Sequence, residues 1–215
     1  MRIGVFGTGM VGQAIASKLV SLGHEVTMGS RDANNEKAKA WAEKTHARIG
    51  TFADAARFGE LLVNATSGTA SLEALQAAGT ENLAGKVLID IANPIDGSSG
   101  MPPSLSVANK DSLGEQVQRA FPASRVVKTL NTMNADVMVN PQLVPGNHNV
   151  FVSGNDAQAK AQVTQLLESF GWPTANILDL GDISSARGTE MYLALWLRLW
   201  GKVGTGHFNI SVVKP

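Results

Sequence analysis

The sequence predicts an α/β fold in which a doubly wound, mostly parallel sheet is covered by helices and followed by a small C-terminal helical extension. Two observations support this fold class. Short apolar runs typical of buried strands, such as residues 61–66 and 86–92, alternate with segments of helical spacing. The first run, Arg2–Phe6, also leads directly into Gly7-Thr8-Gly9-Met10-Val11-Gly12, a GxGxxG turn that opens a helix.

The three glycines of this turn have different tasks. Gly7 allows a tight turn, Gly9 lets the backbone approach a pyrophosphate, and Gly12 lets the helix pack closely on the strand. The free amides and positive dipole at the start of the helix favour an anion. A helix up to Leu22, a turn at Gly23 and a second strand over residues 25–28 complete the unit. This context predicts a Rossmann-like domain that binds a dinucleotide.

The end of the second strand predicts which dinucleotide is bound. NAD-binding domains usually place a carboxylate there to bind the ribose 2′-hydroxyl, whereas this chain has Gly29-Ser30-Arg31-Asp32. A hydroxyl and a guanidinium both donate to a 2′-phosphate, so Ser30 and Arg31 favour NADP. Lys37 adds a third positive contact if the next helix starts near Asn34. Asp32 is expected to cap that helix or to pair with Arg31 in the empty site.

The remaining elements continue the alternation along the chain. We expect a helix around Trp41, strands over residues 49–52, 61–66, 86–92, 125–130, 149–154 and 177–180, helices over 71–78 and 157–170, and an apolar helix from Met191. Residues 1–154 are predicted to form the NADP-binding domain, and residues 155–215 an extension that completes the sheet and the acceptor or dimer region. Residues 95–111 are rich in Gly, Ser and Pro and are either a lid or a plain loop.

Composition narrows the possible partners. The 18 basic and 18 acidic residues give no net charge and predict neither nucleic-acid nor membrane binding. No cysteine is present, which excludes disulfides and thiolate chemistry, and the scattered histidines predict no metal site. A strand at the very start leaves no room for a signal peptide, so we expect a cytoplasmic protein. The apolar helix from Met191 is too short to span a bilayer, and one side of it is either buried or forms a dimer contact.

Five segments in a fixed order point to one family. They are residues 3–9 (Ile-Gly-Val-Phe-Gly-Thr-Gly), 29–31 (Gly-Ser-Arg), 90–94 (Asp-Ile-Ala-Asn-Pro), 128–132 (Lys-Thr-Leu-Asn-Thr) and 150–156 (Val-Phe-Val-Ser-Gly-Asn-Asp). Together they resemble the NADPH-dependent oxidoreductases of the deazaflavin coenzyme F-420, and also the cytosolic reductase domain of the six-transmembrane metalloreductases. The resemblance covers nearly the whole chain. It implies a usually dimeric protein that moves hydride between nicotinamide C4 and a deazaflavin or flavin ring.

The resemblance also implies site residues. It assigns Thr8, Gly9, Met10 and Val11 to the pyrophosphate, Ser30 and Arg31 to the 2′-phosphate, and Thr66, Ser67, Ala92, Asn93 and Pro94 to the nicotinamide side. The acceptor ring is implied to lie near Asn131, Met133, Ser184, Ser185 and Arg187. Deazaflavin enzymes carry His where this chain has Asn131, whereas the metalloreductase domains carry Asn, so this position leans toward flavin. Arg187 either stabilises charge on the acceptor or forms an ion pair.

Hydride transfer is the chemistry of the cofactors themselves, so it requires no protein nucleophile or metal, and we assign no catalytic side chain. The leading prediction is therefore an NADP-dependent oxidoreductase that acts on a deazaflavin or flavin, as a homodimer. One alternative is a reductase of a small imine or carbonyl, which usually needs a proton donor. No strong Lys or His candidate for that donor occurs between Asn131 and Trp200. The other alternative is a redox sensor that binds NADP without turnover.

Overall fold

The structure, a computed structural model, describes residues 1–98 and 100–213. Within them an eight-stranded sheet has the order β10-β9-β8-β5-β4-β1-β2-β3. The strands are β1 (Arg2–Phe6), β2 (Glu25–Ser30), β3 (Arg48–Thr51), β4 (Leu61–Asn64), β5 (Val87–Asp90), β8 (Arg125–Thr129), β9 (Val150–Ser153) and β10 (Ile177–Asp179). Every neighbouring pair is parallel except β8 and β9, which are antiparallel. The predicted mostly parallel α/β fold is confirmed.

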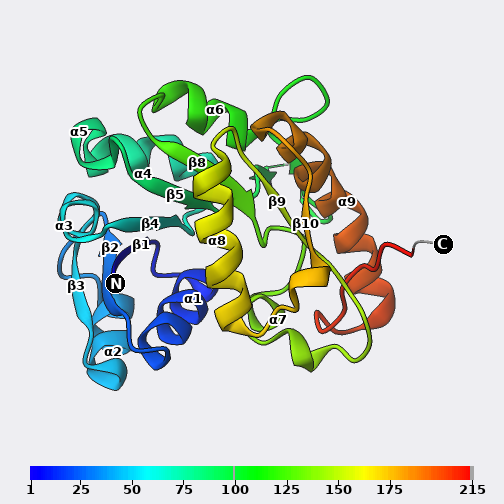
Figure 1. Cartoon of the computed structure of the whole chain (residues 1–215), viewed down its shortest axis with the longest axis horizontal. Coiled ribbons are helices and arrows are strands. Elements are labelled where there is room, and N and C mark those ends of the chain that lie inside the picture. The colour runs from blue at the N-terminus through cyan, green and yellow to red at the C-terminus, as the bar shows by residue number, and fades with distance from the viewer. Residues whose placement is uncertain (99, 214–215) are drawn as a thin grey trace.

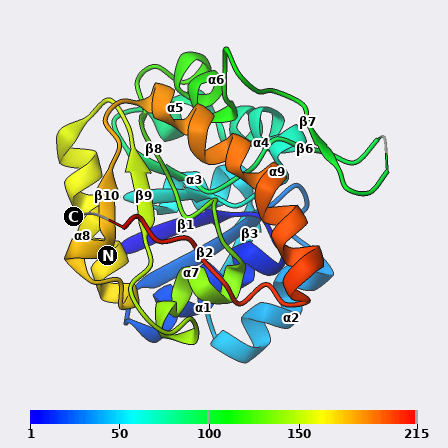
Figure 2. The ribbon, with the colours of Figure 1, turned by 90° about the vertical axis from the view of Figure 1, so that its right-hand side faces the viewer.

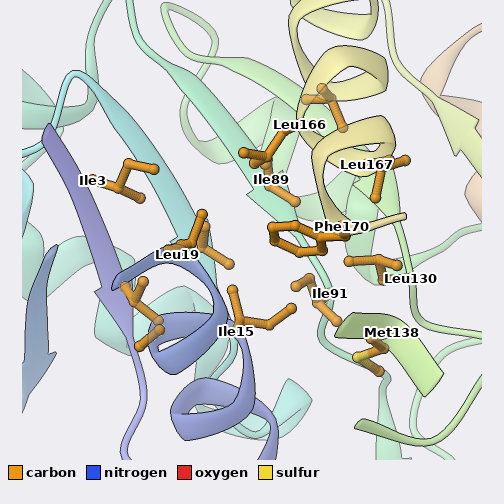
Figure 3. Packing of buried hydrophobic residues seen from close by; sticks show 14 of the residues in the cluster. Ile3, Ile15, Leu19, Ile89, Ile91, Leu130, Met138, Leu166, Leu167 and Phe170 are labelled. Atoms are coloured by element: carbon orange, nitrogen blue, oxygen red, sulfur yellow. The ribbon is translucent and has the colours of Figure 1, made fainter. Parts of the chain in front are cut away.

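Helices cover both faces of this sheet (Figure 1). One face packs against α1 (Met10–Ser21), α2 (Glu36–Thr45), α7 (Ala135–Val139) and α8 (Ala157–Phe170). The other packs against α3 (Phe52–Phe58), α4 (Ser71–Ala78), α5 (Thr80–Leu83) and α6 (Leu113–Ala120). Figure 3 shows the first core, where Ile15 of α1 and Phe170 of α8 lie close to Ile91. Because β4 and β5 are buried on both faces, their sequences are continuous apolar runs up to a polar last residue.

The elements differ from the predictions mainly where the chain is short or polar. The strand expected over residues 49–52 ends at Thr51, because a capping box between Thr51 and Asp54 starts α3 at Phe52. Residues 95–111 hold a small antiparallel hairpin of β6 (Ile95–Asp96) and β7 (Ser104–Leu105), which projects from the body of the molecule (Figure 2). Residue 99 of that predicted loop lies outside the described residues.

The C-terminal part continues the same sheet, since β10 pairs with β9. A short 3₁₀ turn, η4 (Ile183–Ser185), then leads into the long apolar helix α9 (Ala186–Val203) at the right-hand side of Figure 1. Within residues 1–98 and 100–213, none of the helices combines the length and apolar character that a membrane crossing requires. The division of the chain at residue 154 stays a prediction.

Candidate active site

The glycine turn between β1 and α1 has the predicted conformation. Gly7 has a φ of 115°, which favours glycine, and its amide donates to the Gly29 carbonyl at 3.0 Å. A Cβ atom at Gly12 would lie 2.1 Å from the Gly7 carbonyl oxygen, so only glycine lets α1 start this close to the strand. A Cβ atom at Gly9 would meet nothing within 4 Å. The turn is therefore packed on its inner side at Gly12 and open at Gly9, where a phosphate group needs room.

A cavity of about 440 Å³ opens beside this turn, at the carboxyl ends of β1, β2 and β4. It brings together many of the predicted cofactor-binding residues, namely Gly7, Thr8, Gly9, Ser30, Arg31, Thr66 and Ser67. The other predicted residues do not line it. Met10, Val11 and Gly12 form the first turn of α1, Lys37 is exposed in the first turn of α2, and Ala92, Asn93 and Pro94 follow β5.

The segment after β2 presents Arg31 to this cavity. Asp32 does not pair with it: the Asp32 carboxylate accepts the Asn34 amide at 2.9 Å, and within the described part of the chain Arg31 makes no salt bridge. Asp32 does not cap α2 either, because Asn35 is its N-cap and accepts the Ala38 amide at 3.1 Å. Ser30 is 5% exposed, and its hydroxyl donates to the Asp32 carbonyl at 2.5 Å. The Arg31 guanidinium thus keeps its donors for a ligand.

The far wall of the cavity consists of residues that sequence analysis did not select. Phe52 comes from the start of α3, and Ala70, Glu73, Ala74 and Ala77 come from the start and the cavity-facing side of α4. The three alanines recur at helical spacing, which is the signal that could have identified them. The alanine side chains leave their part of the wall flat, which suits a planar ring, while Glu73 adds a carboxylate to the same wall.

A buried hydrogen-bond chain fixes the loop that follows β4. Asn64, the last residue of that strand, is 0% exposed and donates through Nδ2 to Asp90 Oδ1 at 2.8 Å and to Ser71 Oγ at 3.1 Å. Its Oδ1 accepts the Thr66 hydroxyl at 2.7 Å. Buried polar groups therefore fix the position of Thr66, which lines the cavity. In the sequence, this network could have been recognised from the polar residues that end the apolar strands β4 and β5, Asn64 and Asp90.

The loops after β5 and β8 are joined through two asparagines. Asn131 Nδ2 donates to Asn93 Oδ1 at 3.0 Å, and Asn93 Nδ2 donates to the Asn131 carbonyl at 2.7 Å. The loop after β4 also fits tightly here, because a Cβ atom at Gly68 would lie 2.0 Å from the Asn93 carbonyl oxygen. Three loops at the carboxyl edge of the sheet are therefore packed into one rigid rim, as expected where a doubly wound sheet binds its ligand.

The predicted acceptor residues fall into two groups. Asn131 and Met133 lie at the end of β8 and are 2% and 6% exposed, with Met133 packed in the core. Ser184, Ser185 and Arg187 lie in η4 and the first turn of α9, and each already has a partner in the chain. Arg187 donates to both Glu115 oxygens, at 2.8 and 2.5 Å, and this hydrogen-bonded pair holds the pKa of Glu115 below its ordinary value.

A second cavity has a volume of about 190 Å³. It is lined by Thr132, Phe151, Leu180, Gly188, Thr189, Tyr192 and Ile210, from the end of β8, β9, the segment after β10, α9 and the C-terminal tail. Two of its hydroxyls, Thr132 Oγ1 and Tyr192 OH, are buried and have no hydrogen-bond partner. Burial also raises the pKa of Tyr192. Buried hydroxyls normally have partners, so these two are exceptions within the described part of the chain, together with a few polar atoms elsewhere such as Thr27 Oγ1 and Ser153 Oγ.

No metal-binding cluster of side chains is found in the part of the chain that the structure describes. There, no group of three or more His, Asp or Glu side chains lies close enough to hold an ion. The chemical groups gathered at the carboxyl edge include hydroxyls, amides, the Arg31 guanidinium and the carboxylates of Asp32 and Glu73. The hydrogen-bond donors among them are suited to binding phosphates, planar rings and carbonyl groups.

Comparison with known proteins agrees with this geometry. Residues 2–94 match the family model of NADP oxidoreductases dependent on coenzyme F420. The chain is 29% identical over 201 residues to metalloreductase STEAP3 of Rattus norvegicus, covering 92% of this chain and 37% of that protein. It is 28% identical over 210 residues to the F420-dependent NADP reductase of Methanothermobacter marburgensis, covering 93% and 92%.

A crystal structure of a protein from Arthrobacter sp. FB24, described provisionally as an F420-dependent NADP reductase, is 54% identical and superimposes over the whole of both chains with a TM-score of 0.95. The chain spans 37% of the length of the metalloreductase relatives. The glycine turn, the segment Gly29-Ser30-Arg31 and the full-length relatives agree, and the chain belongs to the family of F420-dependent NADP oxidoreductases.

Proposed function

We propose that this protein transfers hydride between NADP(H) and a deazaflavin of the F420 type or a flavin. The observation that carries the proposal is the placement of two cavities around one rigid rim. The first contains the glycine turn and Arg31, and the second contains the unpaired hydroxyls of Thr132 and Tyr192. They are linked because Asn131, the neighbour of Thr132, bonds to Asn93 beside the packed loop of Gly68.

The first cavity fits NADP. The open space at Gly9 would receive the pyrophosphate on the amides of Thr8, Gly9, Met10 and Val11. Arg31 would hold the 2′-phosphate, with a weaker contribution from the exposed Lys37. Ser30 would join it by giving up the hydrogen bond that its hydroxyl donates to the Asp32 carbonyl. The alanine wall of α4 suits the flat adenine ring. Thr66 and Ser67, and then Ala92, Asn93 and Pro94, would lead the other end of the dinucleotide toward the rim.

Bound NADPH would supply a hydride from nicotinamide C4, and the protein would hold the nicotinamide and the acceptor in position. The amide pair of Asn93 and Asn131 fixes the rim against which the nicotinamide would lie. Thr132 and Tyr192 line the second cavity, and after a side-chain rotation their unpaired hydroxyls would be able to donate to carbonyl groups of a planar acceptor, on which hydride transfer would develop negative charge. Because Arg187 is already held by Glu115, the two hydroxyls are stronger candidates for this contact than Arg187, whose role at the acceptor stays a prediction.

Tyr192 also favours a second candidate function. Reduction of a small imine or carbonyl needs a proton donor beside the substrate, and the phenol of Tyr192 carries a proton at neutral pH, although burial raises its pKa and makes it a weaker acid. The cavity of about 190 Å³ would enclose a small substrate, whereas a tricyclic ring would fill it with one edge only. Lysine and histidine are absent from the lining, so Tyr192 is the one donor of this kind among the lining residues.

One experiment separates these functions. NADPH oxidation is followed at the nicotinamide absorbance band with F420, with FMN, with a panel of small imines and carbonyls, and with no acceptor. Turnover with a ring acceptor alone supports the proposal, and turnover with the small panel alone overturns it. NADPH binding without turnover in any arm identifies a sensor. With Tyr192→Phe, a small-substrate reductase should lose about 100-fold or more in kcat, whereas a ring acceptor that takes its proton from solvent should lose far less.

We also propose that α9 forms a homodimer contact. Only four residues of this helix, Ala186, Thr189, Glu190 and Leu193, are buried within the chain. Its second half leaves Leu195 55%, Trp200 43% and Val203 53% exposed. Leu195→Glu should convert a dimer to a monomer in light scattering, while Leu143→Glu, at an equally apolar exposed site in the turn after α7, should not. A wild-type monomer contradicts this contact.

A further inference from the structure

A row of polar side chains crosses the sheet beneath the rim. Asn64, Asp90, Lys128 and Ser153 are the last or next-to-last residues of β4, β5, β8 and β9, and the register pairs each with the next. All four are buried, with Lys128 1% and Asp90 0% exposed. A buried lysine in the middle of a sheet is uncommon, and the hydride transfer proposed for this protein does not use it.

All three protons of the Lys128 ammonium have partners. Nζ lies 2.8 Å from Asp90 Oδ2 and 2.8 Å from Glu190 Oε1, and it also donates to the Ala92 carbonyl. Burial alone lowers the pKa of Lys128, but the two carboxylates more than offset it and hold that pKa above its ordinary value. The group is therefore a permanent charge with fixed directions rather than a proton carrier.

The three partners belong to three different parts of the site. Ala92 precedes Asn93, which bonds to Asn131 at the rim. Asp90 accepts Asn64, which holds the cavity residue Thr66. Glu190 belongs to α9, two residues before Tyr192, and also accepts the amides of Leu113 and Gly114 at 2.8 and 3.0 Å. One ammonium thus touches the support of the first cavity, the rim and the helix that walls the second cavity.

We propose that Lys128 is a positioning residue that sets the distance between the nicotinamide rim and α9. Its ammonium donates to the Ala92 carbonyl in the rim and pairs with Glu190 of α9. The rim and α9, between which hydride would move, are therefore both held by Lys128 Nζ. The proposal rests on the function proposed above. Misplacement of reacting groups by about 1 Å costs about 100-fold in rate, so such a tie affects chemistry more than it affects binding at the phosphate end.

The test uses Lys128→Met, Glu190→Gln and a matched control. Lys86→Met is the control, because Lys86 Nζ also donates to a carbonyl, that of Ala56 at 2.7 Å, but at the amino end of the sheet. Two ligands are titrated, NADPH and 2′-phospho-ADP-ribose, which lacks the nicotinamide. The ratio of their dissociation constants reports how well the rim receives the nicotinamide. The rate of hydride transfer to FMN or F420 is measured in the same proteins, with NADPH and with NADPH deuterated at C4.

For Lys128→Met we expect unchanged affinity for 2′-phospho-ADP-ribose and a loss of about tenfold in the affinity ratio, the size of one or two hydrogen bonds. We also expect a fall of about 100-fold in kcat with a larger deuterium isotope effect. Glu190→Gln should leave the ratio nearly intact and lower kcat, because it releases α9 while Ala92 stays held. Lys86→Met should behave as wild type.

Three results overturn the proposal: equal losses for both ligands, a control that behaves like Lys128→Met, or an unchanged ratio and rate. Removing Lys128 leaves two buried carboxylates uncompensated, which destabilises the fold. If Lys128→Met does not fold, an unchanged kcat in Glu190→Gln overturns the proposal. If no acceptor takes hydride from wild type, the proposed function fails, and the ligand ratio, which needs no acceptor, still decides whether Lys128 positions the rim.

Discussion

Asn93 and Asn131, from loops that follow two neighbouring strands, exchange two hydrogen bonds of 2.7 and 3.0 Å. The side-chain amide of each asparagine has its hydrogen-bond partner in the other loop, so we expect a change at one position to affect the other. Asn131→Ala should lower kcat/KM for NADPH by removing the bond to Asn93 Oδ1, while Asn93 keeps its bond to the backbone carbonyl of residue 131. Asn93→Ala removes both bonds and should lower kcat/KM further. In a double-mutant cycle the losses should not add, with a coupling energy of about 0.5–3 kcal/mol. Additive losses would mean that the two loops are held in place separately.

Arg31 should determine the preference for NADPH over NADH. Its guanidinium faces the first cavity and has no salt bridge in the described chain, so its donors are free for a 2′-phosphate. Arg31→Ala should weaken NADPH by about 10- to 100-fold, as expected for charged hydrogen bonds, and leave NADH nearly unchanged in fluorescence titrations. Lys37→Ala, on the exposed side of α2, should cost much less. Equal affinities for both nucleotides in wild type would contradict an NADP site here.

The second and third glycines of the turn should respond differently to alanine. At Gly12 the new methyl group would meet the Gly7 carbonyl at 2.1 Å, so Gly12→Ala should destabilise the fold by about 1–3 kcal/mol in urea unfolding. At Gly9 the methyl group meets nothing in the chain, so Gly9→Ala should leave unfolding almost unchanged. It should instead weaken NADPH by about tenfold by occupying the space of the phosphate. A large stability loss at Gly9 would contradict this division.

Asp111 gives the fold a specific acid sensitivity. Hydrogen bonds from Arg119 at 3.0 and 2.7 Å are the main reason that the pKa of Asp111 falls from 3.8 to about 2. A folded-state pKa below the unfolded value stabilises the protein above pH 3.8, and that stability is lost as pH falls toward 2. In urea unfolding, Arg119→Gln should be less stable than wild type at pH 7, and the difference should shrink below pH 4. A difference that is constant over this range would exclude the ion pair as its cause.

Much of the fold could be predicted because the central strands are buried on both faces. Runs such as Leu61–Asn64 and Val87–Asp90 allow no structure other than a buried strand or helix segment, and the glycine turn after β1 requires a helix directly behind it. The short helices α3 and α6 were missed, although Thr51 with Asp54 and Ser112 with Glu115 have the spacing of a helix start. A helix-start pattern that is not followed by a long run of helical periodicity is too short a signal to predict a helix.

The site was predictable only where its residues are neighbours in sequence. Ser30 and Arg31 are adjacent at the end of a strand, so the pattern singled them out, and the structure places both in the lining of the first cavity. Their contact with a 2′-phosphate stays a prediction. The wall of α4 and the cavity of Thr132 and Tyr192 depend on contacts between distant segments, which no spacing rule reports. Lys128 is the extreme case, since a lysine at a strand end looks like a surface residue until Glu190 and Asp90 are seen around it.

The burial of Lys128 between two carboxylates also constrains how this protein can change over generations. A single substitution at Lys128, Asp90 or Glu190 leaves an unbalanced charge with no water to receive it, which costs several kcal/mol. An apolar trio of similar volume would remove the charges but would leave the Leu113 and Gly114 amides without their acceptor, so it is not reached without further changes. A lineage is therefore held to this ionic arrangement by the instability of every intermediate, whether or not the arrangement is the most stable one available.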